Sequence, residues 1–498
     1  MRRHLTLLLA SGLLASALPG APAYASPAEH FGFGAHAIGR GGAGVAMPGD
    51  AGSSLLNPAA MADREGSQFF FAYQLARFNF EPLPRVYWDA DRDGLISGPE
   101  DSLQPQNRYD PADAMQIGLA RDVRGWFQVG LAISMPRGRL LRLYTFDPSV
   151  PTYFMYRNRA HRYAVAASVA ASPVRSLQLG AGVRVVSHSR LDVNFTLDGT
   201  VAGEPGEDSD LSDLVAVGAD AHEIDFDLVP DLVPQLGLRW DLGELFPPLE
   251  GLAVGGTWRG EGQIPVTVNI DGQINAGAED IGDIEPAVAV LVAKTQLLLM
   301  DHFLPRQARG GVAYTFRDVV SGYVDVDYTW WSRMALNVSH FANPDFTATL
   351  ADLSELDIQD GNNLSGVVLR NTVGVRGGVD AHLPHFPMPG RFAPARASVR
   401  AGVGYEPSPL VEQTAETALL DSDRLLFAGG LGLDHAAPFA LVEGPWSWDV
   451  FGQLHVLAPG TLQRPNPDTP RAGYPVDGAE IPIGGRIFTA GLQWSLDY

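Results

Sequence analysis

Residues 177–197 read LQLGAGVRVVSHSRLDVNFTL, and apolar and polar side chains alternate along most of this stretch. The apolar side chains fall mainly on odd positions, whereas the even positions carry polar residues that include Gln178, Arg184 and Asp192. A period of two is typical of a β-strand with one apolar and one polar face. The run is about 20 residues long, whereas strands usually have five or six. Strands of a membrane barrel turn their apolar face to lipid and can extend past the bilayer, so the stretch predicts a transmembrane β-barrel.

The same alternation recurs along residues 66–498 and predicts an all-β antiparallel barrel of fourteen strands, an even number as in bacterial single-chain barrels. The strands are expected near residues 67–81, 112–121, 125–138, 158–171, 176–197, 222–242, 250–270, 306–317, 320–337, 365–382, 395–406, 422–435, 445–458 and 485–498. The connections alternate between short and long, as periplasmic turns and extracellular loops do. The predicted extracellular loops are residues 82–111, 198–221, 271–305, 338–364 and 459–484.

Both ends of the chain indicate export to the outer membrane of a Gram-negative cell. Residues 1–25 begin with two arginines, continue with the apolar run LTLLLASGLLASAL and end in Ala-Tyr-Ala, which is the pattern of a cleaved signal peptide. The chain ends in FTAGLQWSLDY, and an aromatic last residue on an alternating strand resembles the outer-membrane assembly signal. We therefore expect a monomer, inserted by the assembly machinery and surrounded by outer-membrane lipid and lipopolysaccharide.

Composition narrows the possible functions. The formal net charge of −22 becomes −24 (−22 − 2) when the two arginines of the signal peptide are removed, and so acidic a chain is poorly suited to bind nucleic acid. The chain has no cysteine and therefore no disulfide framework. The hydrolase motifs GxSxG and HExxH and the phosphate-binding P-loop do not occur, so we predict neither enzymatic activity nor an organic cofactor.

Residues 26–65 precede the first predicted strand and do not alternate. They are rich in glycine and alanine, which allow a segment to fold compactly. A barrel of fourteen strands has an open lumen unless something fills it. This segment is therefore predicted to be a plug, or hatch, inside the lumen, with a flexible periplasmic tail as the alternative.

The segment GRGGAGVAMPGDAGSSLLNPAAMA resembles the N-terminal hatch of the FadL/TodX family of outer-membrane long-chain fatty acid and aromatic hydrocarbon transporters. Asn57, Pro58 and Ala59 stand where that family has its Asn-Pro-Ala hatch motif. MPRG at residues 135–138 is similar to the family's Pro-x-Gly at the end of the third strand, which implies a lateral opening at Pro136 and Gly138. Further similar segments follow in the family's order at residues 304–318, 323–334, 370–383, 397–410 and 422–435.

The resemblance implies fourteen strands and passive uptake of hydrophobic molecules. Extracellular loops would catch a long-chain fatty acid or hydrocarbon, which passes to the hatch and leaves sideways through the barrel wall. A fourteen-carbon tail gains on the order of 10 kcal/mol by leaving water, so uptake needs no energy source. The alternatives are a diffusive porin, which would conduct small sugars, and an outer-membrane enzyme acting on lipids, whose turnover one substitution would abolish.

Residues 286–305 are the candidate capture element. Acidic residues and Pro286 at the beginning predict a helix. An apolar helix on an extracellular loop is a hydrophobic docking surface, although it could instead pack on the barrel rim. Lys294, the only lysine of the chain, is placed to meet a carboxylate. The predicted capture residues are Val288, Leu291, Val292, Lys294, Leu298 and Leu299.

Residues 89–100, DADRDGLISGPE, fit the pattern of a twelve-residue calcium loop, in which Gly94 permits the turn. The expected role of Ca²⁺ is structural, in the first extracellular loop, with an acidic surface loop as the alternative. Without flanking helices the affinity should be modest, on the order of 10⁻⁴–10⁻³ M. The predicted ligands are Asp89, Asp91, Asp93, Leu95, Ser97 and Glu100.

Overall fold

The computed structural model describes most of the chain and leaves out residues 1–26, on which the predicted signal peptide falls. For the strand residues 186–201, 214–229, 263–278 and 289–302 it describes only the course of the backbone. The described ranges are residues 27–63, 66–88, 96, 98–106, 108–137, 149–156, 163–201, 214–278, 289–334, 367–387, 394–413, 417–436, 444–464, 471–478 and 480–498.

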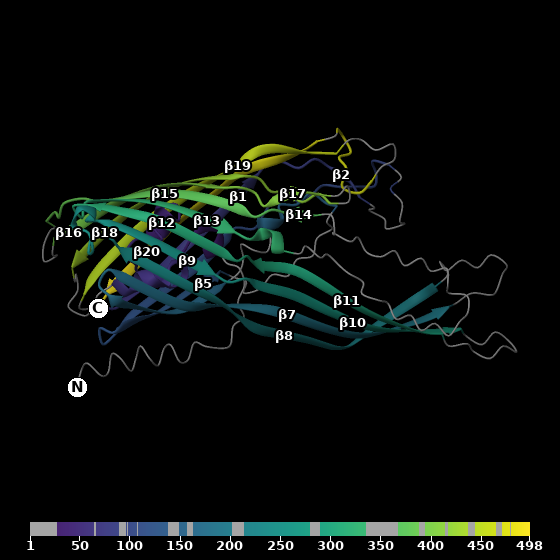
Figure 1. Ribbon diagram of the computed structural model, residues 1–498. Coiled ribbons are helices and arrows are strands. Elements are labelled where there is room, and N and C mark those ends of the chain that lie inside the picture. The colour runs from purple at the N-terminus through teal and green to yellow at the C-terminus, as the bar shows by residue number, and fades with distance from the viewer. Residues whose placement is uncertain are drawn as a thin grey trace.

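The barrel wall is a closed sheet of fourteen strands, as the alternation predicted (Figure 1). Each strand pairs antiparallel with the next, and β1 pairs with β20 to close the barrel. The wall strands are β1 (Gln68–Phe80), β4 (Ala112–Val123), β5 (Phe127–Pro136), β6 (Ala164–Val174), β7 (Leu177–Val201), β8 (Leu214–Asp241), β9 (Leu252–Arg259), β12 (Gln307–Phe316), β13 (Val320–Thr329), β15 (Thr372–His382), β16 (Ala395–Glu406), β18 (Arg424–Ala436), β19 (Pro445–Gln463) and β20 (Glu480–Asp497).

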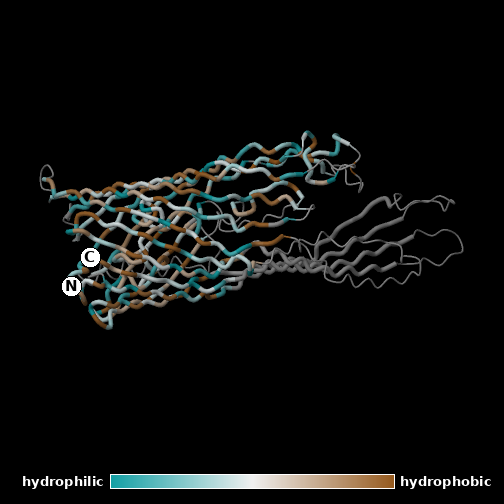
Figure 2. Tube along the Cα trace, turned by 45° about the horizontal axis from the view of Figure 1, so that its top comes forward, coloured by the Kyte–Doolittle hydropathy of each residue, from teal (hydrophilic) through white to brown (hydrophobic). Residues whose placement is uncertain are grey.

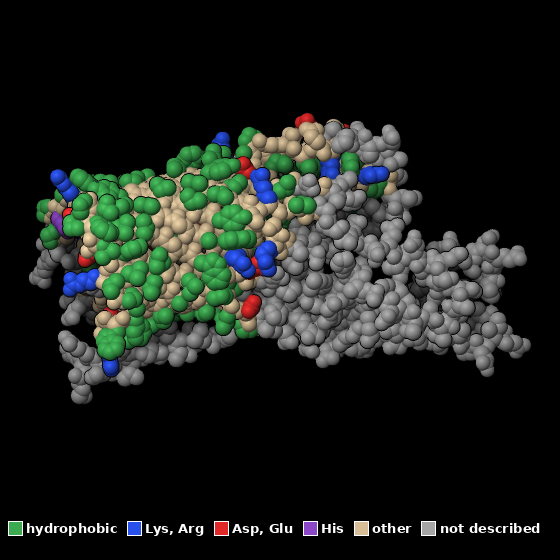
Figure 3. Space-filling view, viewed as in Figure 1, with side chains coloured by type: hydrophobic (Ala, Val, Ile, Leu, Met, Phe, Trp, Pro, Cys, Tyr) green, Lys and Arg blue, Asp and Glu red, His purple; other side chains and the backbone are tan. Residues whose placement is uncertain are grey.

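The period of two puts apolar side chains outside and polar ones inside. On β13, Val324 and Val326 are 57% and 46% exposed, whereas their neighbours Asp325 and Asp327 are buried in the lumen. Figure 2 shows apolar and polar positions alternating along the wall strands, and Figure 3 shows apolar side chains over much of the visible barrel surface. Within the described residues, no helix is long and apolar enough to cross a membrane. The exposed apolar surface is the one that lipid would cover.

An arm of strands extends beyond one end of the barrel (Figure 1). They are the far parts of β7 and β8 together with β10 (Gly262–Ala278) and β11 (Ala289–Leu304). β10 pairs antiparallel with β11 and parallel with β7, so the arm breaks the otherwise antiparallel pattern. The extent of the strand predicted at residues 250–270 is therefore wrong: the wall strand β9 ends at Arg259, and the chain then crosses to the edge of β7 opposite β8, where β10 pairs.

Some predicted loops are also shorter than expected. The loop at residues 198–221 is partly strand, because β7 runs to Val201 and β8 begins at Leu214. Strands β19 and β20 likewise take up the ends of the loop at residues 459–484. Most of the loop predicted at residues 271–305 belongs to β10 and β11, and the helix predicted at residues 286–305 is wrong. Ladder pairing of β11 with β10 outweighs the local helix signals, since tertiary context overrides weak intrinsic propensity.

The N-terminal segment fills the lumen, as predicted. Isolated helices of four to six residues are not stable in water, so contacts with the wall must hold them. The helix α3 lies against β16, β18 and β19, whereas η1 lies against β6, β7 and β8. The hatch elements are α2 (Pro27–Phe31), α3 (Ala35–Gly39), α4 (Ser53–Leu56) and the 3-10 helix η1 (Pro58–Asp63).

Inward-facing glycines of the wall let the hatch backbone lie directly against the barrel. A Cβ atom at Gly255 on β9 would stand 2.6 Å from the Cα atom of Ala46, which is closer than real Cβ atoms approach. A Cβ atom at Gly402 on β16 would overlap the backbone of Arg40 in the same way. Glycine in a strand interior often marks such a close approach of another backbone.

The mouth of the barrel, at the end with the longer connections, is covered by short elements packed on a buried apolar cluster. They are η2 (Phe154–Tyr156), η6 (Trp331–Arg333), the paired β2 (Val86–Tyr87) and β3 (Ser102–Leu103), and the paired β14 (Val368–Leu369) and β17 (Leu410–Glu412). At the opposite end, η5 (Pro247–Leu249) lies in the turn between β8 and β9. The buried cluster includes Phe80, Leu83, Tyr153, Phe154, Tyr156, Phe303, Leu419, Leu420, Ile481 and Ile487.

Candidate substrate site in the barrel lumen

A cavity of about 200 Å³ lies between the mouth and the hatch. Its floor is formed by α2 of the hatch, and η2 contributes Met155 and Tyr156. Five inward-facing arginines from five wall strands surround it, in agreement with the alternation, which places polar side chains in the lumen. These are Arg184 on β7, Arg259 on β9, Arg309 on β12, Arg376 on β15 and Arg424 on β18.

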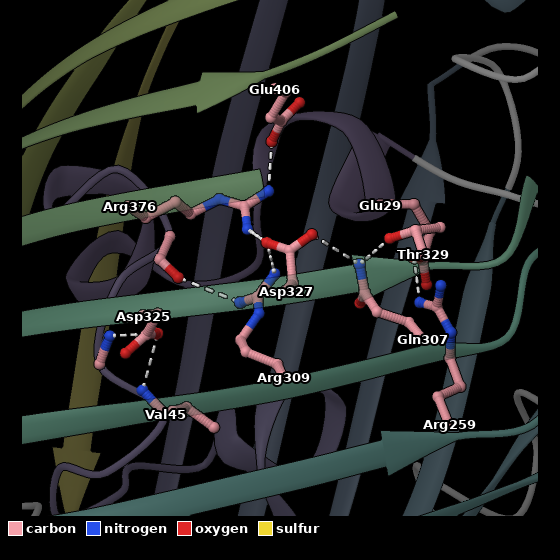
Figure 4. A network of polar contacts seen from close by, with 12 residues as sticks. Glu29, Val45, Arg259, Gln307, Arg309, Asp325, Asp327, Thr329, Arg376 and Glu406 are labelled. Atoms are coloured by element: carbon pink, nitrogen blue, oxygen red, sulfur yellow. Dashed lines mark hydrogen bonds and ion pairs between the residues drawn. The ribbon is translucent and has the colours of Figure 1, made fainter. Parts of the chain in front are cut away.

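Glu29 of α2 ties the hatch to this ring of arginines (Figure 4). Its carboxylate accepts a hydrogen bond from Arg259 at 2.7 Å and another from Arg184, which also donates to the carbonyl of Leu55. Burial alone would raise the pKa of Glu29, but the two guanidinium groups outweigh it and lower the pKa to about 2. Glu29 is therefore ionised at neutral pH and binds two separate wall strands.

A second set of contacts holds the middle of the hatch (Figure 4). The carboxylate of Asp325 accepts the backbone N–H groups of Gly44 at 2.9 Å and Val45 at 3.0 Å. The guanidinium of Arg309 donates to the carbonyl of Gly42 at 3.1 Å and lies 3.7 Å from Asp327. Charge-assisted hydrogen bonds of this kind are stronger than neutral ones, so this short glycine-rich stretch is fixed at several points.

An apolar column of aromatic rings leads from the mouth to the hatch. Phe80 stacks on Tyr153 with ring centroids 4.2 Å apart and contacts Tyr156 at 5.2 Å. Below them, Phe78 lies 6.0 Å from Tyr156 and 6.1 Å from Phe31, the apolar residue that α2 presents to the cavity. Aromatic pairs at these distances pack favourably and form a continuous apolar surface. The rings form a buried apolar cluster beside the charged wall.

The aromatic ring of Tyr153 is held at the barrel mouth by hydrogen bonds of its hydroxyl group. Its hydroxyl donates to the carbonyl of Gly484 at 2.9 Å and accepts from the N–H of the same residue at 2.8 Å. Burial raises the pKa of Tyr153 to about 12, so the hydroxyl stays neutral. A neutral tyrosine keeps the upper part of the column apolar.

The predicted hatch motif is buried at the contact between η1 and the wall. The side-chain amide of Asn57 donates to the carbonyl of Val45 at 2.6 Å and to that of Leu238 on β8 at 3.2 Å, and its oxygen accepts the N–H of Ala59 at 3.1 Å. Pro58 begins η1, where a missing N–H costs nothing. Asn57 therefore joins two parts of the hatch to each other and to the barrel.

A second cavity, of about 350 Å³, lies on the other side of the hatch, at the end with the short turns. The imidazole of His36 lies 3.1 Å from Asp50 of the hatch and 3.6 Å from Asp449 on β19. Burial and Arg400 lower the pKa of His36, but the two carboxylates outweigh them and raise it to about 9. A charged His36 therefore links the hatch to the wall here as Glu29 does above.

The structure describes only part of the other predicted sites. Pro136 is the last residue of β5 and pairs with Ala114 of β4, whereas Gly138 lies outside the described residues. Val288 also lies outside them, and the other capture residues are on β11 rather than on a helix, so the argument from a shared helical face no longer applies.

Five of the six predicted calcium ligands fall outside the described residues, and the sixth, Glu100, is exposed in a turn before β3. Within the part of the chain that the structure describes, no group of three or more His, Cys, Asp or Glu residues is placed to hold a metal ion. The undescribed ligands are Asp89, Asp91, Asp93, Leu95 and Ser97.

Glu29 and most of the lumen arginines were not among the residues predicted from the sequence. Arg184 stood on the predicted polar face of its strand, and the same alternation puts Arg309 and Arg376 on inward positions of theirs. That signal was available from the sequence. Glu29 had none, because the hatch shows no alternation from which its direction could be inferred.

Fold and site together define a class of protein, a closed fourteen-stranded barrel with an apolar outside and a lumen filled by its own N-terminal segment. A FadL homologue from Pseudomonas aeruginosa shares this fold, with a TM-score of 0.50 at 17% identity over 93% of this chain and 98% of that chain. The resemblance to the FadL/TodX family noted in the sequence is thus confirmed at the level of the fold.

Two other solved structures match with lower scores. The toluene transporter TbuX of Ralstonia pickettii has a TM-score of 0.46 at 14% identity, over 94% of this chain and 99% of that chain. The toluene transporter TodX of P. putida has a TM-score of 0.47 at 12% identity, also over 94% and 99%. No protein-family model matches the sequence, and no curated protein does.

Proposed function

We propose that the protein is an outer-membrane channel for the passive uptake of hydrophobic molecules, long-chain fatty acids or hydrocarbons. The observation that carries the proposal is the column of Phe80, Tyr156, Phe78 and Phe31, which ends at a hatch pinned to the wall. Each methylene moved from water to an apolar surface gains about 0.8 kcal/mol, so a molecule can descend the column without an energy source. The family resemblance and the shared fold support the same function.

Release sideways, near the end of β5, completes the proposed route. Ladder pairing between β5 and β6 reaches Ser134 and Ala164, and Pro136 has no N–H with which to continue it. A molecule stopped by the hatch at Phe31 would leave through the wall at Pro136 and Gly138. Capture at the other end is proposed for β11, which carries Leu291, Val292, Lys294, Leu298 and Leu299, and for Val288, which lies outside the described residues.

Replacement of Asn57 by alanine is expected to loosen the hatch and to reduce uptake several-fold without stopping insertion into the membrane. The change removes three hydrogen bonds and takes from the carbonyl of Val45 its side-chain donor, at a cost of about 1–3 kcal/mol. Uptake of labelled oleate and of labelled toluene by cells that express each variant measures the effect. The two labels also separate fatty acids from aromatic hydrocarbons as substrates.

The control for this assay is Asn79→Ala, which changes an exposed asparagine of β1. It should take up both labels at the unaltered rate. If the unaltered protein takes up neither label, the proposed function is wrong. If Asn57→Ala takes them up as fast as the unaltered protein, the hatch motif has no part in transport.

We further propose that residues 89–100 bind one structural Ca²⁺ with modest affinity, on the order of 10⁻⁴–10⁻³ M. The support is the spacing of six oxygen donors and a turn glycine in the sequence. Calorimetric titration of the purified barrel with CaCl₂ should give binding heat that the double variant Asp91→Ala, Glu100→Ala loses. Equal heats from both proteins would mean that the loop is merely acidic.

A further inference from the structure

The two lumen cavities are separated by a thin part of the hatch. Four residues line both of them: Ala37, Gly42 and Leu56 of the hatch and Arg309 of β12. The upper cavity reaches the mouth through Met155 and Trp331, and the lower one reaches the periplasmic end of the barrel at Asp497. A displacement at these four residues alone would join the cavities into one passage.

Glycine backbone and one arginine side chain close this thin part. Gly41 and Gly42 have φ angles of 68° and 80°, a left-handed conformation that other residues rarely adopt. Between the two cavities, the guanidinium of Arg309 donates to the Gly42 carbonyl at 3.1 Å. The same guanidinium lies 3.7 Å from the carboxylate of Asp327 (Figure 4). When the bond to Gly42 breaks, Arg309 can therefore move away from the hatch and keep its ion pair with Asp327.

Charged side chains of both signs line both cavities. Around the upper cavity the five arginines face Glu29, Asp327, Glu406 and Asp421. Polar cavities of this size hold water, and an apolar molecule would have to strip water from charged groups. Around the lower cavity, basic and acidic groups again occur together, namely His36, Arg40, Arg309, Arg400, Asp50, Asp380, Asp434 and Asp497.

We propose that the lumen is a second, gated route, through which inorganic ions and small uncharged polar solutes pass straight to the periplasm when Arg309 releases Gly42. This route passes through the hatch, whereas the proposed release of hydrophobic molecules is sideways through the wall, and it goes beyond the proposed function. The two routes share the upper cavity, where Phe31 and Tyr156 lie among the charged groups, and they diverge at the hatch. Because both basic and acidic side chains line the lumen, the route should have little preference between cations and anions.

Current through the purified, full-length protein in planar bilayers with KCl on both sides tests the proposal. The unaltered protein should open briefly, and Arg309→Ala should raise the mean conductance about threefold or more, because the side chain that closes the passage is gone. Arg309→Lys keeps the charge but loses the planar fork of donors, so its conductance should fall between the two. Gly42→Ala should also raise the conductance, since it strains the φ of 80° and puts a Cβ atom 3.3 Å from Arg376.

The matched control is Arg396→Ala, because Arg396 also donates to a backbone carbonyl, that of Asp318 at 2.8 Å, at an exposed turn away from the lumen. Its conductance should equal that of the unaltered protein. Slower migration after heating on a denaturing gel would establish that each variant is folded. If folded Arg309→Ala conducts no more than the unaltered protein or Arg396→Ala, the proposal is overturned. Uptake of oleate and toluene by the unaltered protein is measured separately, so this failure is distinct from failure of the proposed function.

Discussion

Replacement of Gly255 by valine is expected to detach the middle of the hatch from the wall and to raise the conductance of the lumen about tenfold, since a fourteen-stranded barrel without its plug is an open channel. The first carbon of the new side chain would stand 2.6 Å from the Cα atom of Ala46 and from the carbonyl oxygen of Val45. Both contacts are to backbone, which cannot rotate away as a side chain can. The wall should survive, because valine is a strong strand former. Planar-bilayer conductance measures the opening.

The next residue provides the control. A Cβ atom added at Gly256 would have its nearest neighbour, the carbonyl oxygen of Arg309, at 3.7 Å. Gly256 pairs with Leu238, whose side chain is exposed on the outside of β8. Gly256→Val should therefore add an apolar side chain on the lipid side and leave conductance unchanged. Equal conductances for the two valine variants would contradict the packing of the hatch against β9.

The second large effect is expected for Glu29→Gln. The change leaves Arg184 and Arg259 buried without the carboxylate that both contact, and breaking such a buried pair costs about 3–5 kcal/mol. The N-terminal part of the hatch should then spend far more time away from the wall, which exposes Arg40, now buried, to trypsin. The rate of cleavage after Arg40, followed by mass spectrometry, is the measurement. Replacing Arg259 by glutamine in the same protein should restore part of the protection by removing one uncompensated charge.

Acid should reproduce this effect in the unaltered protein. The pKa of Glu29 falls from an ordinary 4.5 to about 2 when the hatch is docked. At acidic pH the docked state therefore binds fewer protons than the released state. The stabilisation from Glu29 is therefore complete above about pH 4.5 and is lost as the pH falls towards 2. An acid-stable protease should cut the unaltered hatch faster over this range, and Glu29→Gln should lose the part of the pH dependence that Glu29 causes. Asp113→Asn, at the half-exposed pair with Arg77, should behave as the unaltered protein.

The sequence was most informative where one face of a strand meets lipid. Residues such as Val324 and Asp325 differ so strongly in their surroundings that alternation gave the correct number of wall strands. The β10–β11 hairpin was misread because an apolar run such as residues 289–304 fits a helix as well as a strand. Acids and a proline in front of the run favoured the helix, and only the partner strand, far along the chain, decides otherwise.

The site was predictable to a smaller extent. The position of Asn57 in the lumen followed from the family motif, and an inward direction for Arg184 followed from alternation. That Glu29 meets Arg184 and Arg259 could not be inferred, because the three residues are brought together by closure of the barrel across 155 and 230 positions of sequence. The glycines against the hatch, such as Gly255, look in the sequence like gaps in a strand pattern, and only the docked backbone of Ala46 explains them.

The seam between β1 and β20 sets the order in which the molecule can be built. Gln68 pairs with Asp497, 429 positions later (497 − 68), and the backbone of Ser67 bonds in both directions with that of Tyr498. The barrel cannot close until β20 pairs with β1, and a contact between residues so far apart in sequence forms slowly. Because the hatch precedes β1, the wall can assemble around it and no segment has to be threaded into a finished ring. A chain that stops before β20 would keep an open strand edge on β1, the kind of edge along which chains associate.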